Sequence, residues 1–181
     1  MKFSSLFMAG AAAMSLSACM AMDTDGDGAA DTTAAAADMT PENGMAYVAM
    51  SGSSDMFEIE SSRLHHAQGQ NRELHAYAQK MIDHHTQLTA QTVAAARAAG
   101  MSPPAPMLMP MHQQMLERLR PLRGAAFDRE YKRLQETSHE MALRLQQNYA
   151  NDGDTPQLRS NAQAATPIVQ GHLNEIRNIR V

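Results

Sequence analysis

A stretch from Asn71 to Gly100 is the longest uninterrupted helical pattern in the sequence. Asn71 is a good N-cap, and Gly100, which is soon followed by Pro103 and Pro104, predicts the end of the helix. Side chains at steps of three and four form one stripe along it: Leu74, Tyr77, Met81, His84, Leu88, Gln91 and Ala95. This stripe predicts that His84 points into a core, where a titratable ring needs a polar partner.

Other segments show the same periodicity. A helical pattern begins at Thr40-Pro41, pauses at the Gly/Ser cluster 51–54, where the helix could kink or break, and ends at Gly69. Residues 101–110 hold four prolines and cannot be regular, and a short helix is expected over 111–122. Long helices follow at 125–149 and 155–179, the second with a kink expected at Pro167. No stretch alternates like a strand, so we predict an all-α four-helix bundle over residues 40–181, with the short helix between helices two and three.

The first residues have the pattern of an export signal. Residues 1–18 begin with Lys2, continue as a small and apolar run, and end in Leu16-Ser17-Ala18 before Cys19. This resembles the lipobox of bacterial lipoproteins, in which the cysteine becomes the acylated N-terminus; an ordinary signal peptide cleaved nearby is the alternative. Met20 after the cysteine resembles the outer-membrane sorting preference. We therefore expect a protein anchored by lipid at Cys19 on the periplasmic side of the envelope, in the outer membrane.

Residues 19–39 are rich in Ala, Asp and Gly and predict a flexible acidic tether. The run from Asp23 to Gly28 resembles half of a calcium loop, but Ala34 stands where the bidentate Glu should be, so a linker is the better interpretation. The net charge of −4 gives no nucleic-acid footprint. After the signal, no apolar run approaches the ~20 residues needed to span a bilayer.

Histidines and one carboxylate on the core stripes could hold a metal. His84, His139 and His172 come from three helices, and Glu60 lies between Phe57 and Leu64 on the first. Imidazole and carboxylate groups from facing helices form the usual metal site in a bundle core. The competing interpretation is that these groups only hydrogen-bond or ion-pair with one another.

A second set of candidate ligands lies in the proline-rich segment: Met107, Met109, Met111 and His112. Thioethers with an imidazole suit Cu(I). Because the chain holds sixteen methionines, the same cluster could be adaptable core filler. The common hydrolase, nucleotide-binding and zinc-protease motifs are missing, so we expect no enzyme.

Four ordered landmarks resemble the exported bacterial family called domain of unknown function 4142. They are Met56-Phe-Glu58-Ile-Glu60, Tyr77 to His84 with its Met-Ile-Asp-His ending, Phe127-Asp-Arg-Glu-Tyr131 followed by Ser138-His139, and Thr166-Pro167 to His172-Leu173. The resemblance covers residues 45–179 and implies a ferritin-like four-helix bundle. It also implies a set of motif residues: Glu60, Asp83, His84, His139 and His172.

Two departures from the family pattern are Ser138 in place of Asp and Thr166 in place of Leu. A di-iron centre is not expected, because two bridging Glu residues of ferritin-like sites are missing here. The first hypothesis is one transition metal bound by His84, His172 and Glu60, with His139 and Asp83 assisting. The alternatives are a structural or stress-related module with an internally satisfied polar core, and a copper binder that uses the methionine cluster.

Overall fold

The structure is a computed structural model, and it describes residue 41 and residues 43–181. The predicted signal 1–18, the predicted acylation site Cys19 and the predicted tether 19–39 lie outside the described residues. Five helices follow in order: α1 (Gly44–Gln68), α2 (Arg72–Ala98), α3 (Pro110–Leu119), α4 (Gly124–Asp152) and α5 (Pro156–Asn178). The described residues contain helices and no strand, so the prediction of an all-α bundle with a short extra helix between helices two and three is confirmed.

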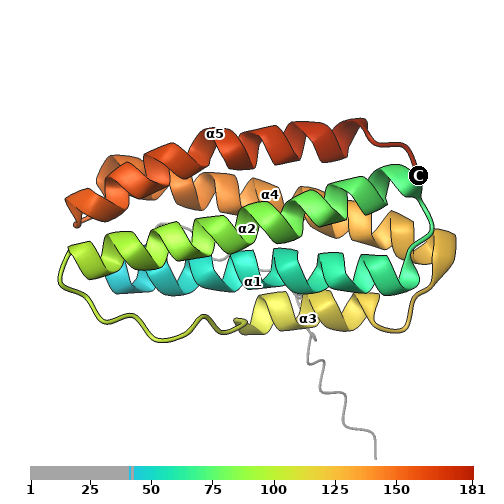
Figure 1. Cartoon of the computed structure of the whole chain (residues 1–181), viewed down its shortest axis with the longest axis horizontal. Coiled ribbons are helices and arrows are strands. Elements are labelled where there is room, and N and C mark those ends of the chain that lie inside the picture. Colours follow the sequence, from blue (N-terminus) through green and yellow to red (C-terminus); the bar gives the residue numbers. More distant parts are fainter. Residues whose placement is uncertain (1–40, 42) are drawn as a thin grey trace, which may run out of the picture. The chain divides into compact units, whose positions relative to one another are not determined.

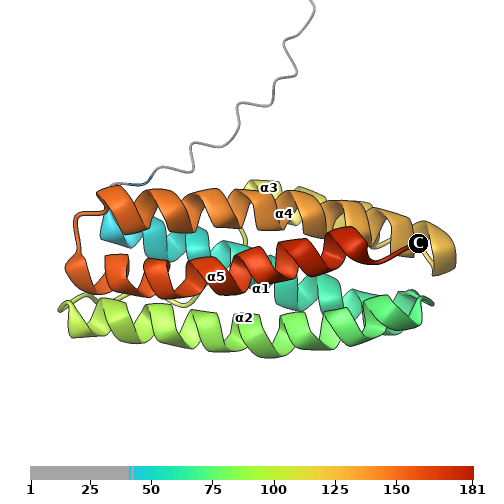
Figure 2. The same ribbon diagram turned by 90° about the horizontal axis from the view of Figure 1, so that it is seen from above.

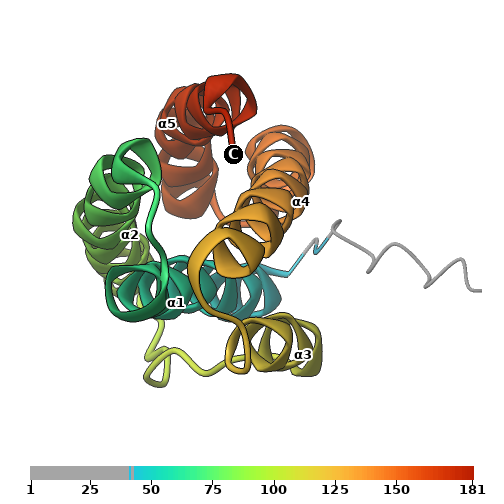
Figure 3. The same ribbon diagram turned by 90° about the vertical axis from the view of Figure 1, so that its right-hand side faces the viewer.

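Two helical hairpins form the bundle. α1 packs mainly against α2 and α4 packs mainly against α5, while α3 lies along α1 and touches α4 (Figures 1, 2 and 3). α1 and α2 begin with good caps, since the side chains of Asn43 and Asn71 accept hydrogen bonds from the first free backbone N–H groups of these helices. None of the described helices is both long and apolar enough to cross a bilayer.

The Gly/Ser cluster does not break the first helix, because α1 runs through it without interruption. Residues 51–54 are all buried, and a Cβ at Gly52 would lie 3.1 Å from the ring of Pro106. The small side chains therefore let the proline-rich connection approach the helix closely. α5 likewise continues through Pro167 as one helix.

Apolar side chains fill the bundle on both sides of a polar layer. One cluster includes Met81, Leu134 and Leu173, and another includes Leu88, Ala142 and Val169. On α2, α4 and α5 these residues flank His85, His139 and His172, respectively. The three histidines therefore lie at one level of the bundle, between two apolar layers that keep water away.

Candidate metal centre

A buried group of titratable side chains occupies the polar layer. Asp55 and Glu58 come from α1, His85 from α2, His139 from α4 and His172 from α5, and each is at least 96% buried. Polar groups in such a position need partners, because transfer from water without compensating bonds is costly. All four long helices thus contribute to one site.

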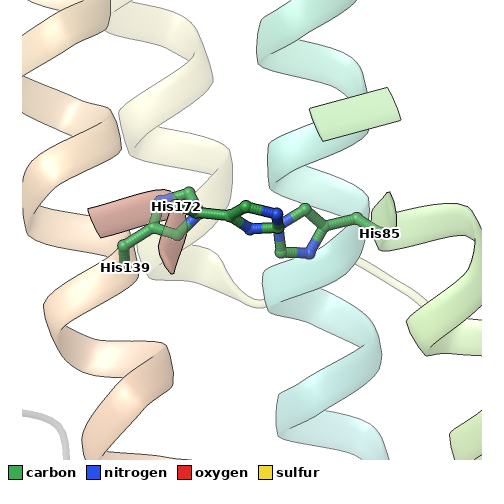
Figure 4. Close-up of side chains that lie close together, drawn as sticks. All are labelled: His85, His139 and His172. Atoms are coloured by element: carbon green, nitrogen blue, oxygen red, sulfur yellow. The ribbon is translucent and has the colours of Figure 1, made fainter. Parts of the chain in front are cut away.

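The three imidazole rings form a nearly regular triangle. Ring centroids are 5.5 Å apart for His85 and His139, 5.3 Å for His85 and His172, and 5.4 Å for His139 and His172. Each ring offers a nitrogen, and the three offered nitrogens all lie within 4.8 Å of one another (Figure 4). Ligands at ~2.1 Å from one ion lie up to ~4 Å apart, so small side-chain shifts would bring this set around a metal.

One nitrogen of each ring already has a partner. Nδ1 of His85 lies 2.8 Å from Oδ1 of Asp55, and Nδ1 of His139 lies 2.8 Å from the carbonyl oxygen of Gln135. Both partners only accept, so each Nδ1 carries a hydrogen and the neutral ring keeps its lone pair on Nε2. Such outer contacts fix the tautomer and orientation of metal-binding histidines.

His172 is held in the same way by a fourth histidine. Its Nε2 lies 2.8 Å from Nδ1 of the half-buried His84. When His172 donates this hydrogen bond, its lone pair is on Nδ1. The remaining nitrogens, Nε2 of His85 and His139 and Nδ1 of His172, are buried and have no hydrogen-bond partner.

The carboxylate of Glu58 is also buried without a hydrogen-bond partner. The residue is 1% exposed, and neither carboxylate oxygen has a hydrogen-bond partner. Oε1 lies 3.6 Å from Nδ1 of His139, which is beyond hydrogen-bonding distance. The three convergent imidazoles fit a divalent cation, and the nearby carboxylate supplies a negative charge that would favour one.

Burial adjusts the histidines toward the form that binds metal. It lowers the pKa of His139, and burial with neighbouring imidazoles lowers the pKa of His172 to about 2. Burial also opposes protonation of His85, but the hydrogen bond to Asp55 and the negative charges of Asp55 and Glu58 together outweigh it and raise the pKa of that ring. His139 and His172 are therefore neutral at neutral pH, which is the state a metal requires.

The metal-free chain should lose stability on acidification. Burial lowers the pKa of four histidines below the ordinary 6.5: His65 (to about 4), His112, His139 and His172 (to about 2). A depressed folded-state pKa contributes stability that is full above 6.5 and is lost as pH falls toward the folded value. His85, with a raised pKa, acts in the opposite direction but is one group against four.

The measurement is the urea midpoint of chelator-treated protein at about pH 7.5 and about pH 5.5, a window above the ordinary carboxyl pKa values near 4. We expect a lower midpoint at the lower pH. An equal or higher midpoint would show that the buried histidines are not neutral in the fold.

The structure brings together only part of the predicted set. His139 and His172 lie in the triangle, and His84 supports it from outside. Glu60 is different: the expectation that it faces the core is wrong, because its side chain is 44% exposed and pairs with Arg63 at 2.7 Å. Asp83 is also exposed and accepts a hydrogen bond from Gln79 on its own helix.

Sequence reasoning missed Asp55, Glu58 and His85. In α2 the buried face shares Met81 and Leu88 with the predicted stripe. It contains His85 and Thr92 where the prediction had the residue before each of them. In α1 a polar stripe could have been read from Asp55, Glu58, Ser62 and His65, whose spacing of three and four puts them on one buried face. The expectation that His84 is the core-facing histidine of its helix is therefore wrong, and His85 takes that position.

The methionine cluster is spread over different surroundings. Met107 is 75% exposed, and with Met109 it lines a largely apolar cavity of about 330 Å³ between α1, α2 and the proline-rich connection. Met111 packs against the main apolar cluster instead. His112 is buried, and its Nδ1 lies 2.7 Å from Oγ of Ser53.

Replacing His84 with alanine should weaken metal binding without unfolding the protein. The change leaves Nε2 of His172 without its partner, and loss of an outer-shell partner of a ligand typically costs about 10–100-fold in metal affinity. Competition titration against a chelating dye measures the affinity. Gln87→Ala, an exposed change one turn along α2, is the control and should have no effect. Equal affinity in both variants would contradict the role given to His84.

Comparisons with known proteins agree with this architecture. CopM, solved in its Cu(II)-bound form, has the same fold with a TM-score of 0.63 and 18% sequence identity, covering 75% of this chain and 93% of that one. A search of curated proteins finds no match. The model of the family DUF4142, a domain of unknown function, matches residues 29–179. That match spans all five helices and the whole histidine triangle, and the chain therefore belongs to the DUF4142 family.

Proposed function

We propose that the protein binds one transition-metal ion, copper in preference to others, at His85, His139 and His172, with Glu58 as the fourth ligand. The observation that carries this proposal is the convergence of three buried imidazole rings, each with one nitrogen that has no hydrogen-bond partner. A structural core would leave few such atoms, because buried polar groups are nearly always hydrogen-bonded.

The donor set and the fold both favour copper. Imidazole suits Cu, Zn, Ni and Fe, and at a given nitrogen and oxygen site Cu²⁺ binds most tightly of the first-row divalent ions. The similar fold of CopM is known in a Cu(II)-bound form. A mononuclear site also fits the one buried glutamate of the layer, since di-iron centres need several bridging carboxylates.

The structural module is the other class of function considered above. It requires an internally satisfied polar core, whereas the layer leaves both oxygens of Glu58 and one nitrogen of each ring in the triangle without partners. The methionine cluster, as a separate Cu(I) site, has less support, because Met107 is exposed while Met111 packs into the core. We therefore assign the metal to the triangle.

The test is a titration of the chelator-treated full chain with Cu²⁺ and, separately, Zn²⁺. Wild type should bind one tight equivalent of copper, with electron paramagnetic resonance showing coupling to imidazole nitrogen. In His139→Gln and His172→Gln this tight equivalent should be lost, while Met107→Leu/Met109→Leu should retain it. Because the two histidines are buried, circular dichroism must show that the variants keep their helices.

Thermal unfolding of wild type gives a second readout that needs no variant. An ion that binds only the folded chain raises the midpoint in a concentration-dependent way. Copper that neither binds tightly nor shifts the midpoint, with the same result for zinc, would overturn the proposal and favour the structural module.

We further propose that the chain is exported and held by acylated Cys19 on the periplasmic side of the cell envelope, at the outer membrane. Support comes from the signal-like residues 1–18 and the lipobox-like residues before Cys19. Cells grown with a labelled fatty acid should label the wild-type protein, whereas Cys19→Ser should remain unlabelled. Unlabelled wild-type protein would indicate an ordinary signal peptide.

A further inference from the structure

A second group of histidines lies at the turn between α1 and α2, away from the triangle. His66 is in the last turn of α1, and His75 is in the first turn of α2. Their Nδ1 atoms face each other at 3.3 Å. Along α2, His75 and His85 are ten residues apart, or about 15 Å at the rise of an α-helix, so the two groups share no ligand.

The two rings meet edge to edge. The two ring planes are nearly parallel, at 15°, and the ring centroids are 5.4 Å apart. The Nδ1 atoms are only 3.3 Å apart, so these two nitrogens lie on the facing edges of the rings. Two neutral rings can share only one hydrogen across such a contact. Two imidazole nitrogens at ~2.1 Å from one ion lie ~3–4 Å apart, and the observed 3.3 Å falls in this range.

The turn itself is held rigidly. Only residues 69–71 join the two helices, and the carboxylate of Asp128 accepts hydrogen bonds from the backbone N–H groups of Gln70 and Asn71, each at 3.1 Å. Asn71 also caps α2 through its side chain. The backbone that carries both histidines is thus fixed before any ligand arrives, which lowers the entropic cost of binding.

A third histidine, His65, packs against His75 of this pair. Its Nε2 lies 3.0 Å from Oδ1 of Asp128, and its ring stands edge-on to His75 with centroids 4.7 Å apart. A Cβ at Gly69 would lie 2.4 Å from that Nε2, so the turn needs glycine where it crosses the ring. His75 is therefore backed by a buried ring, while His66 is exposed.

We propose that His66 and His75 form a second, solvent-accessible site for a borderline transition-metal cation such as Cu²⁺ or Zn²⁺, with water completing its coordination. Imidazole is a preferred ligand of these ions. The carbonyl end of α1 favours a cation and the amino end of α2 disfavours one, so the affinity must come from the two lone pairs. An ion reaches this site without opening the bundle, and it should exchange faster than one held in the buried triangle.

The test is a calorimetric titration of the full chain with Zn²⁺ as the only metal. It compares His139→Gln/His172→Gln, which disables the triangle, with the same chain carrying His66→Gln and His75→Gln as well. The first should retain one exchangeable equivalent of zinc, and the added changes should weaken it by at least roughly tenfold because no imidazole pair remains at the turn. Gln70→Ala, an exposed change in the same turn, is the matched control.

Nitrogen-15 spectra of the imidazole side chains supply a readout that does not depend on the triangle variants folding. In wild type, zinc should shift the Nδ1 resonances of His66 and His75 together. Shifts of neither resonance, or zinc binding that survives His66→Gln/His75→Gln in wild-type and triangle-variant backgrounds alike, would overturn the second site. Neither result depends on whether the triangle itself binds metal.

Discussion

Replacing Asp55 with alanine should destabilise the protein by about 3 kcal/mol, because removal of one partner from a buried charged pair leaves the other uncompensated. Oδ1 of Asp55 lies 2.8 Å from Nδ1 of His85, and Oδ2 accepts a hydrogen bond from Thr89 at 2.9 Å. The carboxylate and the ring are both almost fully buried. Chemical denaturation of chelator-treated protein measures the loss.

The same change should also lower metal affinity. Asp55 fixes the ring of His85 and keeps its pKa raised, and a more basic imidazole is a stronger ligand. Asp55→Asn separates the two effects, since an amide oxygen can still accept from His85 while the negative charge is gone. We expect Asn to recover part of the stability but little of the copper affinity.

Asp83→Ala is the matched control. Asp83 is exposed, and its one described contact is a hydrogen bond with Gln79, so its loss should change the free energy of unfolding by no more than about 0.5 kcal/mol. If Asp55→Ala were as mild as Asp83→Ala, the pairing of Asp55 with His85 would not stabilise the fold. If both lowered copper affinity equally, the effect would be one of net charge.

The contrast between these two aspartates shows how far the sequence leads. The long periodic segments, the Asn71 cap and the proline-rich connection were enough to predict the bundle and its extra helix, because each depends on local physics. The start of the first helix was predicted at Thr40-Pro41, whereas α1 begins at Gly44. In the structure, the short connections after α1 and α4 place each of these helices beside the next one in the chain. The break considered at residues 51–54 did not occur, since small side chains there allow close packing against Pro106.

The sequence predicted only part of the site, because the rotational phase of two helices could not be determined from it. His139 and His172 were expected on or beside their core stripes, and both are buried among apolar neighbours. At His84-His85, adjacent side chains point about 100° apart, and apolar stripes can be drawn through either. Tertiary packing selects His85, and nothing local in α2 distinguishes the two.

Glu58 and Glu60 pose the same problem on α1. The spacing Phe57, Glu60, Leu64 suggested a core position for Glu60, but the buried face turns through Glu58, Ser61 and Ser62 instead. From sequence alone, serines are expected at the surface. Here they are buried because the hydroxyls bond within the core: Ser62 contacts the hydroxyl of Tyr131 at 2.8 Å, and Ser61 accepts from Gln135 at 3.0 Å.

Replacing Glu58 with leucine should have opposite effects on the metal-free and metal-bound protein. Without metal, the carboxylate is buried with neither oxygen hydrogen-bonded, and a buried carboxylate without hydrogen bonds carries a desolvation cost that an apolar side chain of similar volume does not. We therefore expect a higher denaturation midpoint for the chelator-treated variant. With copper, the variant lacks a negatively charged ligand, so its affinity should fall and the stabilisation by copper should shrink.

Glu60→Leu is the control that makes this pair of results specific. It lies on the same helix two residues away, but its side chain is 44% exposed and paired with Arg63, so leucine there should change neither the midpoint nor copper binding appreciably. A binding-site residue can destabilise the metal-free protein and stabilise the metal-bound one. A residue that only serves the structural core would not show this reversal. A Glu58→Leu variant that is less stable without metal would mean that the carboxylate serves the fold, and it would remove Glu58 from the proposed ligand set.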